Sequence, residues 1–291
     1  MTELLAIYNE GAGSAGDRAR AAAVDTLRAG GADVVEAPVG EKDLDETLDA
    51  HPGHDVVVLG GDGTLHVTVA ALHRRGELTT RTVGLVPLGT GNDFARGLGI
   101  PLDPPQAARV VLAGRSTPLD LLLDDEGEVV VNVVHLGVGA EASERATPLK
   151  PALGRLAYPV GALLAGVRSP GWRLRVTVDG RPITDGRRVL MAGIGNGVTI
   201  GGGTPVAPRA RPDDGMVDVV VALTTGPLQR LSYALRLRRG THPGLRDVVT
   251  ARGREVLAEG EPVPVNADGE LTGRTSRRRW TVVPAAWRMF T

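Results

Sequence analysis

The 291-residue sequence predicts an α/β fold in which an N-terminal parallel-sheet domain precedes a β-rich, sandwich-like second domain. Two observations support this prediction. Through residue 115, short apolar or β-branched runs alternate with helical segments, and strands separated by helices form parallel βαβ units. Near Pro118 the character changes, and the later signals are mainly strand-like, with Gly, Asp and Pro at the turns between them.

The elements of the first domain follow in order along the chain. Apolar or β-branched runs predict four strands, at residues 4–8, 34–35, 55–59 and 82–87. The helical segments between them run from the glycine-rich stretch 11–16 to about residue 27, and over residues 43–48 and 64–75. Since helices connect successive strands, we expect a parallel sheet that is covered on both faces.

The second domain is predicted from strand-like stretches with two helical interruptions. The strand-like stretches are residues 119–137, 172–221 and 247–283, and the helical ones are 153–167 and 228–239. We therefore predict a nucleotide-binding domain at 1–117 and a β-rich domain at 118–283, with the C-terminal tail 284–291 as a candidate to rejoin the first domain.

Composition excludes several classes of function. A formal net charge of −1 and an aromatic content of 3% argue against a nucleic-acid partner. The absence of cysteine rules out disulfides, thiolate metal sites and a cysteine nucleophile. The N-terminal residues lack the pattern of a secretory signal, and no apolar run reaches the ~20 residues of a membrane span. We expect a cytoplasmic protein that can still dock on a membrane surface.

The glycine-rich segment Gly11–Gly16 leaves three interpretations open. Its glycine spacing matches the dinucleotide-binding fingerprint, with Glu36 placed to contact a ribose. Ser14 gives a loose match to the nucleophile elbow of hydrolases. A phosphate-facing loop at a helix N-terminus needs only backbone N–H groups, and it suits the segment equally.

The segment Gly60-Gly-Asp-Gly-Thr64 follows the third predicted strand and opens a helix. Its glycines allow close approach of a ligand, and the N–H groups of a helix start favour phosphate oxygens. Asp62 would repel a phosphate unless Mg²⁺ lies between them or the carboxylate accepts a proton from the attacking hydroxyl. Alternatively, Asp62 caps the helix that follows.

A second polar segment, Pro87-Leu-Gly-Thr-Gly-Asn-Asp-Phe-Ala-Arg96, follows the fourth predicted strand. Thr90, Asn92 and Asp93 supply a hydroxyl, an amide and a carboxylate, and Asn92 or Asp93 could also cap a short helix. Parallel sheets bind ligands beyond the carboxyl ends of their strands, where both segments are expected to lie.

Taken as a pair, the two segments resemble the diacylglycerol kinase catalytic-domain family, which also contains sphingosine and ceramide kinases and bacterial lipid kinases. NAD kinases and 6-phosphofructokinases share the first segment alone. In the second domain, further segments look like the family's later motifs: Asn132, Gly195–Gly197, Gly201–Gly203, Asp213–Asp218 and Asp268–Glu270. The first loop departs from the family's usual Asn-Pro-x-Ser-Gly, because Glu10 and Ala12 replace the Pro and Ser.

The resemblance implies a kinase that uses ATP and Mg²⁺ to phosphorylate a lipid hydroxyl, in a cleft between two domains. Diacylglycerol is the expected acceptor and phosphatidic acid the expected product. The residues that the resemblance and the loop patterns place at ATP are Asn9, Glu10, Gly11, Ala12, Gly13, Gly61, Asp62, Gly63, Thr64, Thr90 and Asn92.

The resemblance also implies catalytic and metal-binding roles. Glu270 is expected as the base that accepts the hydroxyl proton, with Asp93 and Asp62 as the other catalytic carboxylates. A structural Mg²⁺ is expected at Asp214, with the backbone carbonyls of Arg211 and Met216 as further ligands.

Two alternatives stay open, namely an NAD kinase and a non-catalytic nucleotide- or lipid-binding protein of the same fold. A nicotinamide oxidoreductase is disfavoured because no catalytic residues of that class are visible. A lipid acceptor would bring the enzyme to a membrane as a peripheral partner, and the cluster Arg274 with Arg277–Arg279 is the candidate contact. A homodimer also stays open.

Overall fold

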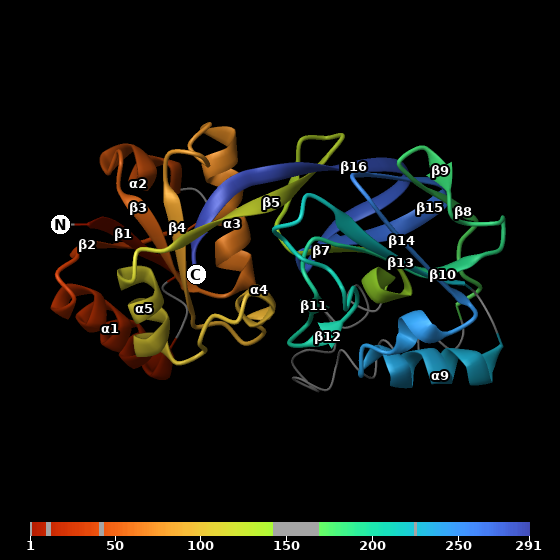
Figure 1. The fold of residues 1–291 in the computed structure, drawn as a ribbon, viewed down its shortest axis with the longest axis horizontal. Coiled ribbons are helices and arrows are strands. Elements are labelled where there is room, and N and C mark those ends of the chain that lie inside the picture. The colour runs from red at the N-terminus through yellow and green to blue at the C-terminus, as the bar shows by residue number, and fades with distance from the viewer. Residues whose placement is uncertain (1, 10–12, 41–43, 142–168, 224–225) are drawn as a thin grey trace. The chain divides into compact units, whose positions relative to one another are not determined.

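The computed structural model describes residues 2–9, 13–40, 44–141, 169–223 and 226–291 (Figure 1). Two compact units make up the chain, one comprising Met1–Leu121 with Val283–Thr291 and the other Leu122–Val282. We expected the boundary near residue 117, whereas the division falls inside the strand β5 (Ser116–Asp124). The helix predicted at 153–167 lies outside the described residues.

The first unit contains the parallel sheet that the sequence predicts. Its strands are β1 (Glu3–Tyr8), β2 (Asp33–Pro38), β3 (Asp55–Gly60) and β4 (Thr82–Pro87). The order is β2-β1-β3-β4, and every neighbouring pair is parallel. The C-terminal end of β16 (Glu270–Phe290) adds a further parallel strand beside β4. Val56, Val57 and Val58 have no exposed surface, as expected for a strand that is covered on both faces.

Five described helices accompany this sheet, and Figure 1 shows them lying on both of its faces. They are α1 (Gly13–Ala29), α2 (Leu44–Ala50), α3 (Asp62–Arg74), α4 (Asp93–Gly97) and α5 (Pro104–Leu112). Helix α1 packs against α5, and α2 against α3. Helix α5 was not predicted from the sequence. Its start is marked by a proline in the first turn and by Asp103, which accepts a hydrogen bond from the Gln106 N–H at 3.1 Å.

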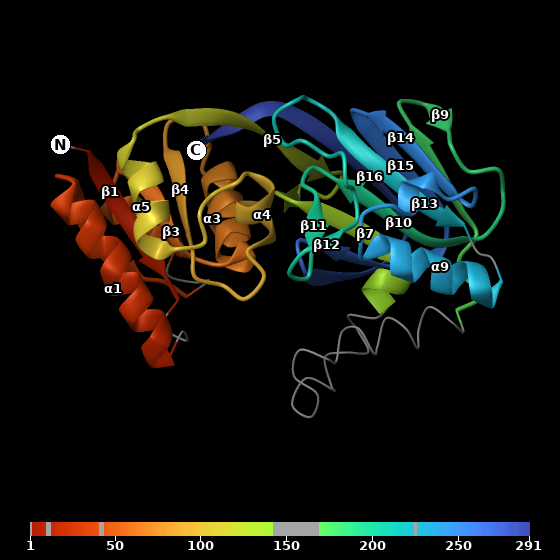
Figure 2. The same cartoon turned by 60° about the horizontal axis from the view of Figure 1, so that its bottom comes forward.

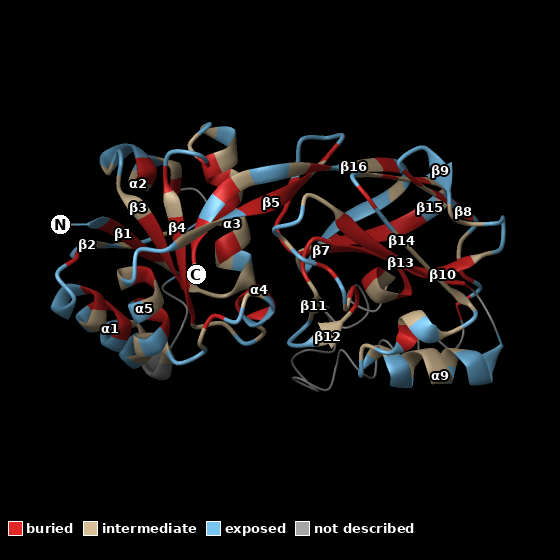
Figure 3. Cartoon of the chain, viewed as in Figure 1, coloured by how far each residue is buried: buried red, intermediate tan, exposed pale blue. Residues whose placement is uncertain are grey.

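The second unit is β-rich, as predicted, and its strand pairs are antiparallel. Its further strands are β6 (Val129–Val130), β7 (Val133–Gly137), β8 (Leu174–Val178), β9 (Arg181–Pro182), β10 (Val189–Gly195), β11 (Thr199–Ile200), β12 (Thr204–Pro205), β13 (Val217–Leu223), β14 (Val248–Gly253) and β15 (Glu255–Ala267). The main strand order is β14-β13-β10-β7-β15-β16. Figure 3 shows the buried residues concentrated along these strands. Among the described helices, including α9 (Pro227–Leu237) and the 3₁₀ turn η4 (His242–Gly244), none is long and apolar enough to cross a membrane.

The C-terminal end of β16 supports the second polar segment from within the first unit. Trp287 has no exposed surface, and its ring stacks on Phe94 of α4 with 5.8 Å between the ring centroids. The Trp287 indole N–H donates to the Asp120 carbonyl at 3.1 Å. Residues from the end of the chain therefore help to hold α4 in place.

Candidate active site

The two polar segments of the first unit touch each other through glycine backbone. A Cβ atom added at Gly89 would lie 2.6 Å from the Cα of Gly61, and one added at Gly61 would lie 3.0 Å from the Cα of Gly89. Such distances leave no room for a side chain at Gly89 and very little at Gly61. The glycines therefore serve the contact between two loops, where the sequence suggested close approach of a ligand.

Asp62 joins the same two loops through its carboxylate. Its Oδ2 accepts a hydrogen bond from the Asp93 N–H and its Oδ1 accepts one from the Phe94 N–H, each at 3.0 Å. The suggestion that Asp62 caps its own helix is wrong, since α3 begins at Asp62 with Gly61 at the N-cap and no side-chain cap. Asp62 instead satisfies backbone donors in the first turn of α4.

Asn92 shapes the second polar segment. It adopts a left-handed conformation with φ of 52°, and its side-chain amide donates to the Gly89 carbonyl at 2.8 Å. The Asn92 side chain is buried, and it does not cap α4. Asp93 is also buried, whereas Thr90 is exposed. Of the three polar residues predicted here, Thr90 is the exposed one.

The N-terminal turn of α3 faces open space at Gly63. A Cβ atom added there would have no neighbour within 4 Å. The first intrahelical bond of the turn runs from the Leu65 N–H to the Gly61 carbonyl, so the preceding N–H groups have no partner inside the helix. Such groups are suited to bind phosphate oxygens.

The first glycine loop follows β1, the parallel neighbour of β3. Asn9 is exposed just beyond β1, and α1 begins at Gly13. Because β1 and β3 are adjacent and parallel, the helix starts of α1 and α3 follow strands that end at the same edge of the sheet. The predicted contacts of residues 10–12 lie outside the described residues.

In the second unit, a tight turn presents Glu270. The carboxylate of Asp268 accepts hydrogen bonds from three successive N–H groups, those of Val131 at 2.7 Å, Asn132 at 2.9 Å and Val133 at 3.0 Å. Asp268 and Gly269 have φ of 50° and 95°, as in the two-residue turns that Asp-Gly favours. Glu270 then opens β16 with an exposed side chain, so the turn fixes the backbone at Glu270 and leaves its side chain open to solvent.

The other motif residues of the second unit pack around the same backbone. The Asn196 amide donates to the Val131 carbonyl at 2.7 Å, and the Asn132 amide donates to the Thr199 carbonyl at 2.9 Å. A Cβ atom added at Gly197 would lie 1.9 Å from the Asn132 Oδ1, so a side chain there would displace the Asn132 amide. These residues support the turn that carries Glu270. Their supporting role could not be predicted from sequence spacing.

Family models match both units of this chain. A model of the diacylglycerol kinase catalytic domain matches residues 3–123. A model of the YegS C-terminal NAD kinase beta sandwich-like domain matches residues 132–291. The chain belongs to the diacylglycerol kinase catalytic-domain family.

Curated relatives of this family member include proteins named "Probable lipid kinase YegS-like". The one from Xanthomonas oryzae pv. oryzae is 34% identical, with 81% of this chain and 78% of the relative covered. Its counterpart from Klebsiella pneumoniae is 31% identical, with 91% and 89% covered. The protein from Pseudomonas aeruginosa is 36% identical, with 80% and 75% covered.

Solved structures share the fold. One, described as a diacylglycerol kinase from Bacillus anthracis str. Sterne, superposes with a TM-score of 0.72 at 19% identity, covering 99% of this chain and 96% of the other. A second structure from the same organism has a TM-score of 0.80 at 22% identity, covering 99% and 94%.

The Asp214 carboxylate, which the family resemblance implies as a magnesium ligand, is paired with an arginine and a backbone N–H. One carboxylate oxygen of Asp214 pairs with the Arg252 guanidinium, and the other accepts the Met216 N–H at 3.1 Å. Arg252 also binds Asp218, whose pKa is raised because burial outweighs the opposing effect of Arg252. The Arg211 side chain lies at the surface and pairs with Asp213.

A guanidinium therefore stands where the cation was expected. Within the described residues, no group of three or more His, Cys, Asp or Glu side chains could hold a metal ion. The Asp214 carboxylate is thus already paired in this arrangement, and the Mg²⁺ ligands predicted there remain a prediction.

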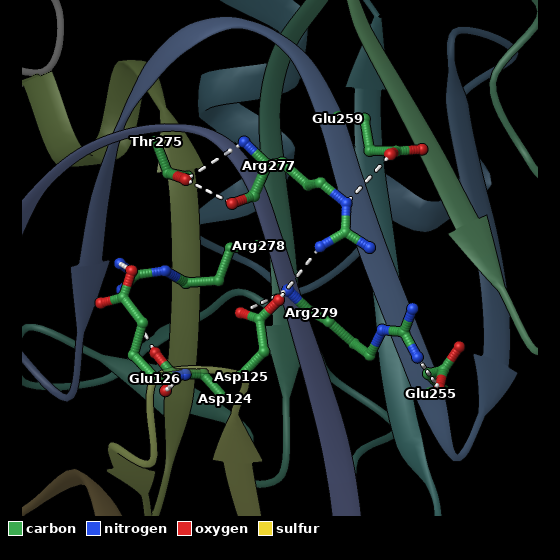
Figure 4. Close-up of polar contacts among 9 residues, drawn as sticks. All are labelled: Asp124, Asp125, Glu126, Glu255, Glu259, Thr275, Arg277, Arg278 and Arg279. Carbon is green, nitrogen blue, oxygen red and sulfur yellow. Dashed lines mark hydrogen bonds and ion pairs between the residues drawn. The ribbon is translucent and has the colours of Figure 1, made fainter.

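The arginine cluster at the end of the second unit is neutralised by carboxylates (Figure 4). Arg277 pairs with Asp125 and Glu259, and Arg279 pairs with Glu255. Arg278 is buried and pairs with two further carboxylates, Asp124 and Glu126. Five carboxylates thus face three of the cluster's four guanidinium groups, so Arg277, Arg278 and Arg279 add no net positive charge to this surface. The interpretation of the cluster as the contact with an anionic membrane is not supported.

Proposed function

We propose that this chain transfers the γ-phosphate of ATP to a lipid hydroxyl, with diacylglycerol as the acceptor and phosphatidic acid as the product. Family membership supports the coarser part of the proposal, a phosphotransferase that acts on a lipid alcohol. The observation that carries it is the pair of loops joined by Asp62 at the carboxyl edge of the parallel sheet. Phosphoryl transfer needs mainly positioning and neutralisation of charge, which such loops can supply.

In the proposed reaction the nucleotide phosphates lie against the first glycine loop, which follows β1, and against the N-terminal turn of α3. The backbone at Gly63 and Thr64 and the hydroxyl of Thr90 are the proposed donors, because Gly63 faces open space and Thr90 is exposed. The family implies ATP as co-substrate, and a Mg²⁺ ion carried by the nucleotide would neutralise phosphate charge. We assign no protein ligand to that ion.

Glu270 is the proposed base. As the lipid hydroxyl oxygen forms its bond to the γ-phosphorus, the bond to the bridging oxygen of ATP breaks, the hydroxyl proton passes to Glu270, and ADP leaves. Of the three carboxylates predicted as catalytic, Glu270 is the exposed one. Asp62 is committed to two backbone N–H groups, and Asp93 is buried, so both are proposed to hold the loops in position.

The acceptor is tested by incubating the protein with ATP labelled at the γ-phosphate and a panel of lipid alcohols in mixed micelles. The panel includes diacylglycerol, sphingosine and ceramide, with NAD as a soluble control. We expect label in phosphatidic acid and none in NADP. Label in another lipid would show that this lipid, and not diacylglycerol, is the acceptor. Label in NADP alone would establish the NAD kinase alternative.

A further inference from the structure

Helix α9 carries a row of leucines that nothing in the described structure covers. Leu228, Leu231 and Leu235 are 80%, 47% and 54% exposed, and no residue of the helix is buried. At 3.6 residues per turn these three positions fall within an arc of about 60°, so they form one stripe along the helix. Figure 3 shows α9 coloured as exposed and intermediate along its length.

The opposite face of α9 is the one that holds it to the second unit. The Arg230 guanidinium donates to the Ser169 carbonyl at 2.7 Å. The Tyr233 ring meets the His242 ring edge to face at 5.5 Å between centroids, and its hydroxyl contacts the Met191 sulfur at 3.7 Å. The helix is therefore held to its unit by the face opposite the leucine stripe, and Figure 2 shows it along one side of that unit's strands.

The charge around this stripe is one-sided. Between Gly226 and Arg246 the sequence contains five arginines and no aspartate or glutamate, in a chain whose formal net charge is −1. Arg236, Arg238 and Arg239 lie at the C-terminal end of α9 or just beyond it, and none of them forms an ion pair within the described residues. This differs from the neutralised cluster at Arg277–Arg279.

We propose that α9 is the helix by which this protein docks on an anionic phospholipid bilayer. Exposed leucines on one face, beside arginines that form no ion pair in the part of the chain that the structure describes, are the two features of helices that lie in a membrane interface. The leucines would enter the boundary of the acyl chains, while the arginines meet the lipid phosphates. The inference rests on the proposed function, because a diacylglycerol acceptor resides in a bilayer.

A second copy of the chain is the other occupant that an apolar stripe could have. The arginines favour the bilayer, since two identical α9 surfaces would bring like charges together. The stripe is also narrow, consisting of three leucines, whereas a stable dimer interface needs on the order of 1,000 Å² or more.

The test is co-sedimentation of the full chain with vesicles of phosphatidylcholine alone or with phosphatidylglycerol added. We expect binding to the anionic vesicles that falls as salt rises from about 0.1 M to about 1 M. The triple variant Leu228→Gln, Leu231→Gln, Leu235→Gln should lose about 10²-fold or more of this binding, because it removes the apolar stripe while keeping good helix formers.

The variant Leu102→Gln is the matched control, since Leu102 is an exposed leucine, at 39%, in the first unit. A second variant that replaces Arg236, Arg238 and Arg239 by Gln should bind weakly and with little salt dependence. If the triple leucine variant binds vesicles as the wild type does, the proposal is wrong. It is also overturned if the wild type sediments as a dimer that the same substitutions dissociate.

Activity separates this proposal from the proposed function. On a short-chain diacylglycerol kept below its critical micelle concentration, the triple leucine variant should match the wild type, because no interface is involved. A wild type that binds vesicles yet labels no lipid alcohol would remove the proposed activity and leave the docking helix standing. A wild type that labels diacylglycerol but ignores anionic vesicles would remove the helix alone.

Discussion

At the scale of single residues, the three glycines of the site do different work. Gly61 and Gly89 lie backbone against backbone, so a side chain at either one disturbs the fold of the loops. Gly63 stands in the open first turn of α3, where a side chain meets no protein atom. Substitutions at Gly63 can therefore report on a ligand, and those at Gly89 report on folding.

Gly63→Ala is expected to keep or slightly raise the stability of the protein, because alanine is favoured over glycine in a helix by up to about 1 kcal/mol. The added methyl group would stand where the nucleotide phosphates approach, so ATP affinity should fall by about tenfold or more. Titration calorimetry and thermal melts measure the two effects. Gly89→Ala is the control and should lower the melting temperature. Unchanged ATP affinity in Gly63→Ala would place the phosphates elsewhere.

The buried His135 predicts a dependence of stability on pH. Burial lowers its pKa from 6.5 to about 4, against a hydrogen bond with Asn266 that favours the protonated form. Between these values the unfolded chain binds more protons than the folded one, so stability rises with pH through the window and is lost as pH falls through it. The contribution is about 3 kcal/mol at most.

Urea unfolding across that pH window measures this contribution. His242, whose pKa is also lowered by burial, adds to the same trend. His135→Gln should therefore reduce the rise in stability between about pH 4.5 and 6.5 without abolishing it. An unchanged slope in this variant would mean that His135 does not govern the dependence.

At the scale of elements, the first unit could largely be predicted from the sequence. Its strands are β-branched runs of the right length, and its helices fill the intervals between them. Helix α5 was not predicted because its signals, Asp103 and the prolines after it, are local capping features, and the periodicity of apolar residues does not reveal them. The single strand β16 escaped because its exposed charged residues resemble short strands with turns between them.

The site was predictable in its residue types and less so in its contacts. The family resemblance pointed to Asp62, but the carboxylate binds N–H groups of residues 31 and 32 positions further along the chain. Arg252 lies 38 positions from Asp214, and nothing in the local sequence marks it as the partner. Such long-range pairs follow from the register of strands, which a pattern of single residues does not contain.

The turn at Asp214 predicts how the protein responds to Mg²⁺ in the absence of nucleotide. Because Arg252 occupies the carboxylates of Asp214 and Asp218, added Mg²⁺ should leave the melting temperature of the wild type nearly unchanged. Arg252→Gln should lower the melting temperature, and Mg²⁺ should recover part of the loss by binding the freed carboxylates.

Thermal melts with and without Mg²⁺ decide between the two views of this turn, with Asp214→Asn as the matched control. If Mg²⁺ raises the wild-type melting temperature and Asp214→Asn abolishes the rise, the turn is the metal site that the family resemblance implies, and Arg252 gives way to the ion.

At the scale of the whole molecule, the chain builds the first unit, forms the second, and returns to the first in the last residues of β16. The proposed nucleotide loops belong to the first unit, and the proposed base belongs to the second. We therefore expect phosphoryl transfer to a lipid to require residues of both units. A variant of the nucleotide loops should lose ATP affinity, whereas a variant of Glu270 should lose transfer rate.

The variant Glu270→Gln tests whether transfer requires the second unit. The measurement is transfer of label from γ-labelled ATP to diacylglycerol in micelles, and ATP affinity is measured on the same variant. Glutamine keeps the size of the side chain and removes its capacity to accept a proton, so the transfer rate should fall by about 10²-fold or more. ATP affinity and the melting temperature should stay near those of the wild type, because Glu270 is exposed and lies outside the first unit. Transfer by Glu270→Gln at the wild-type rate would show that Glu270 is not the base.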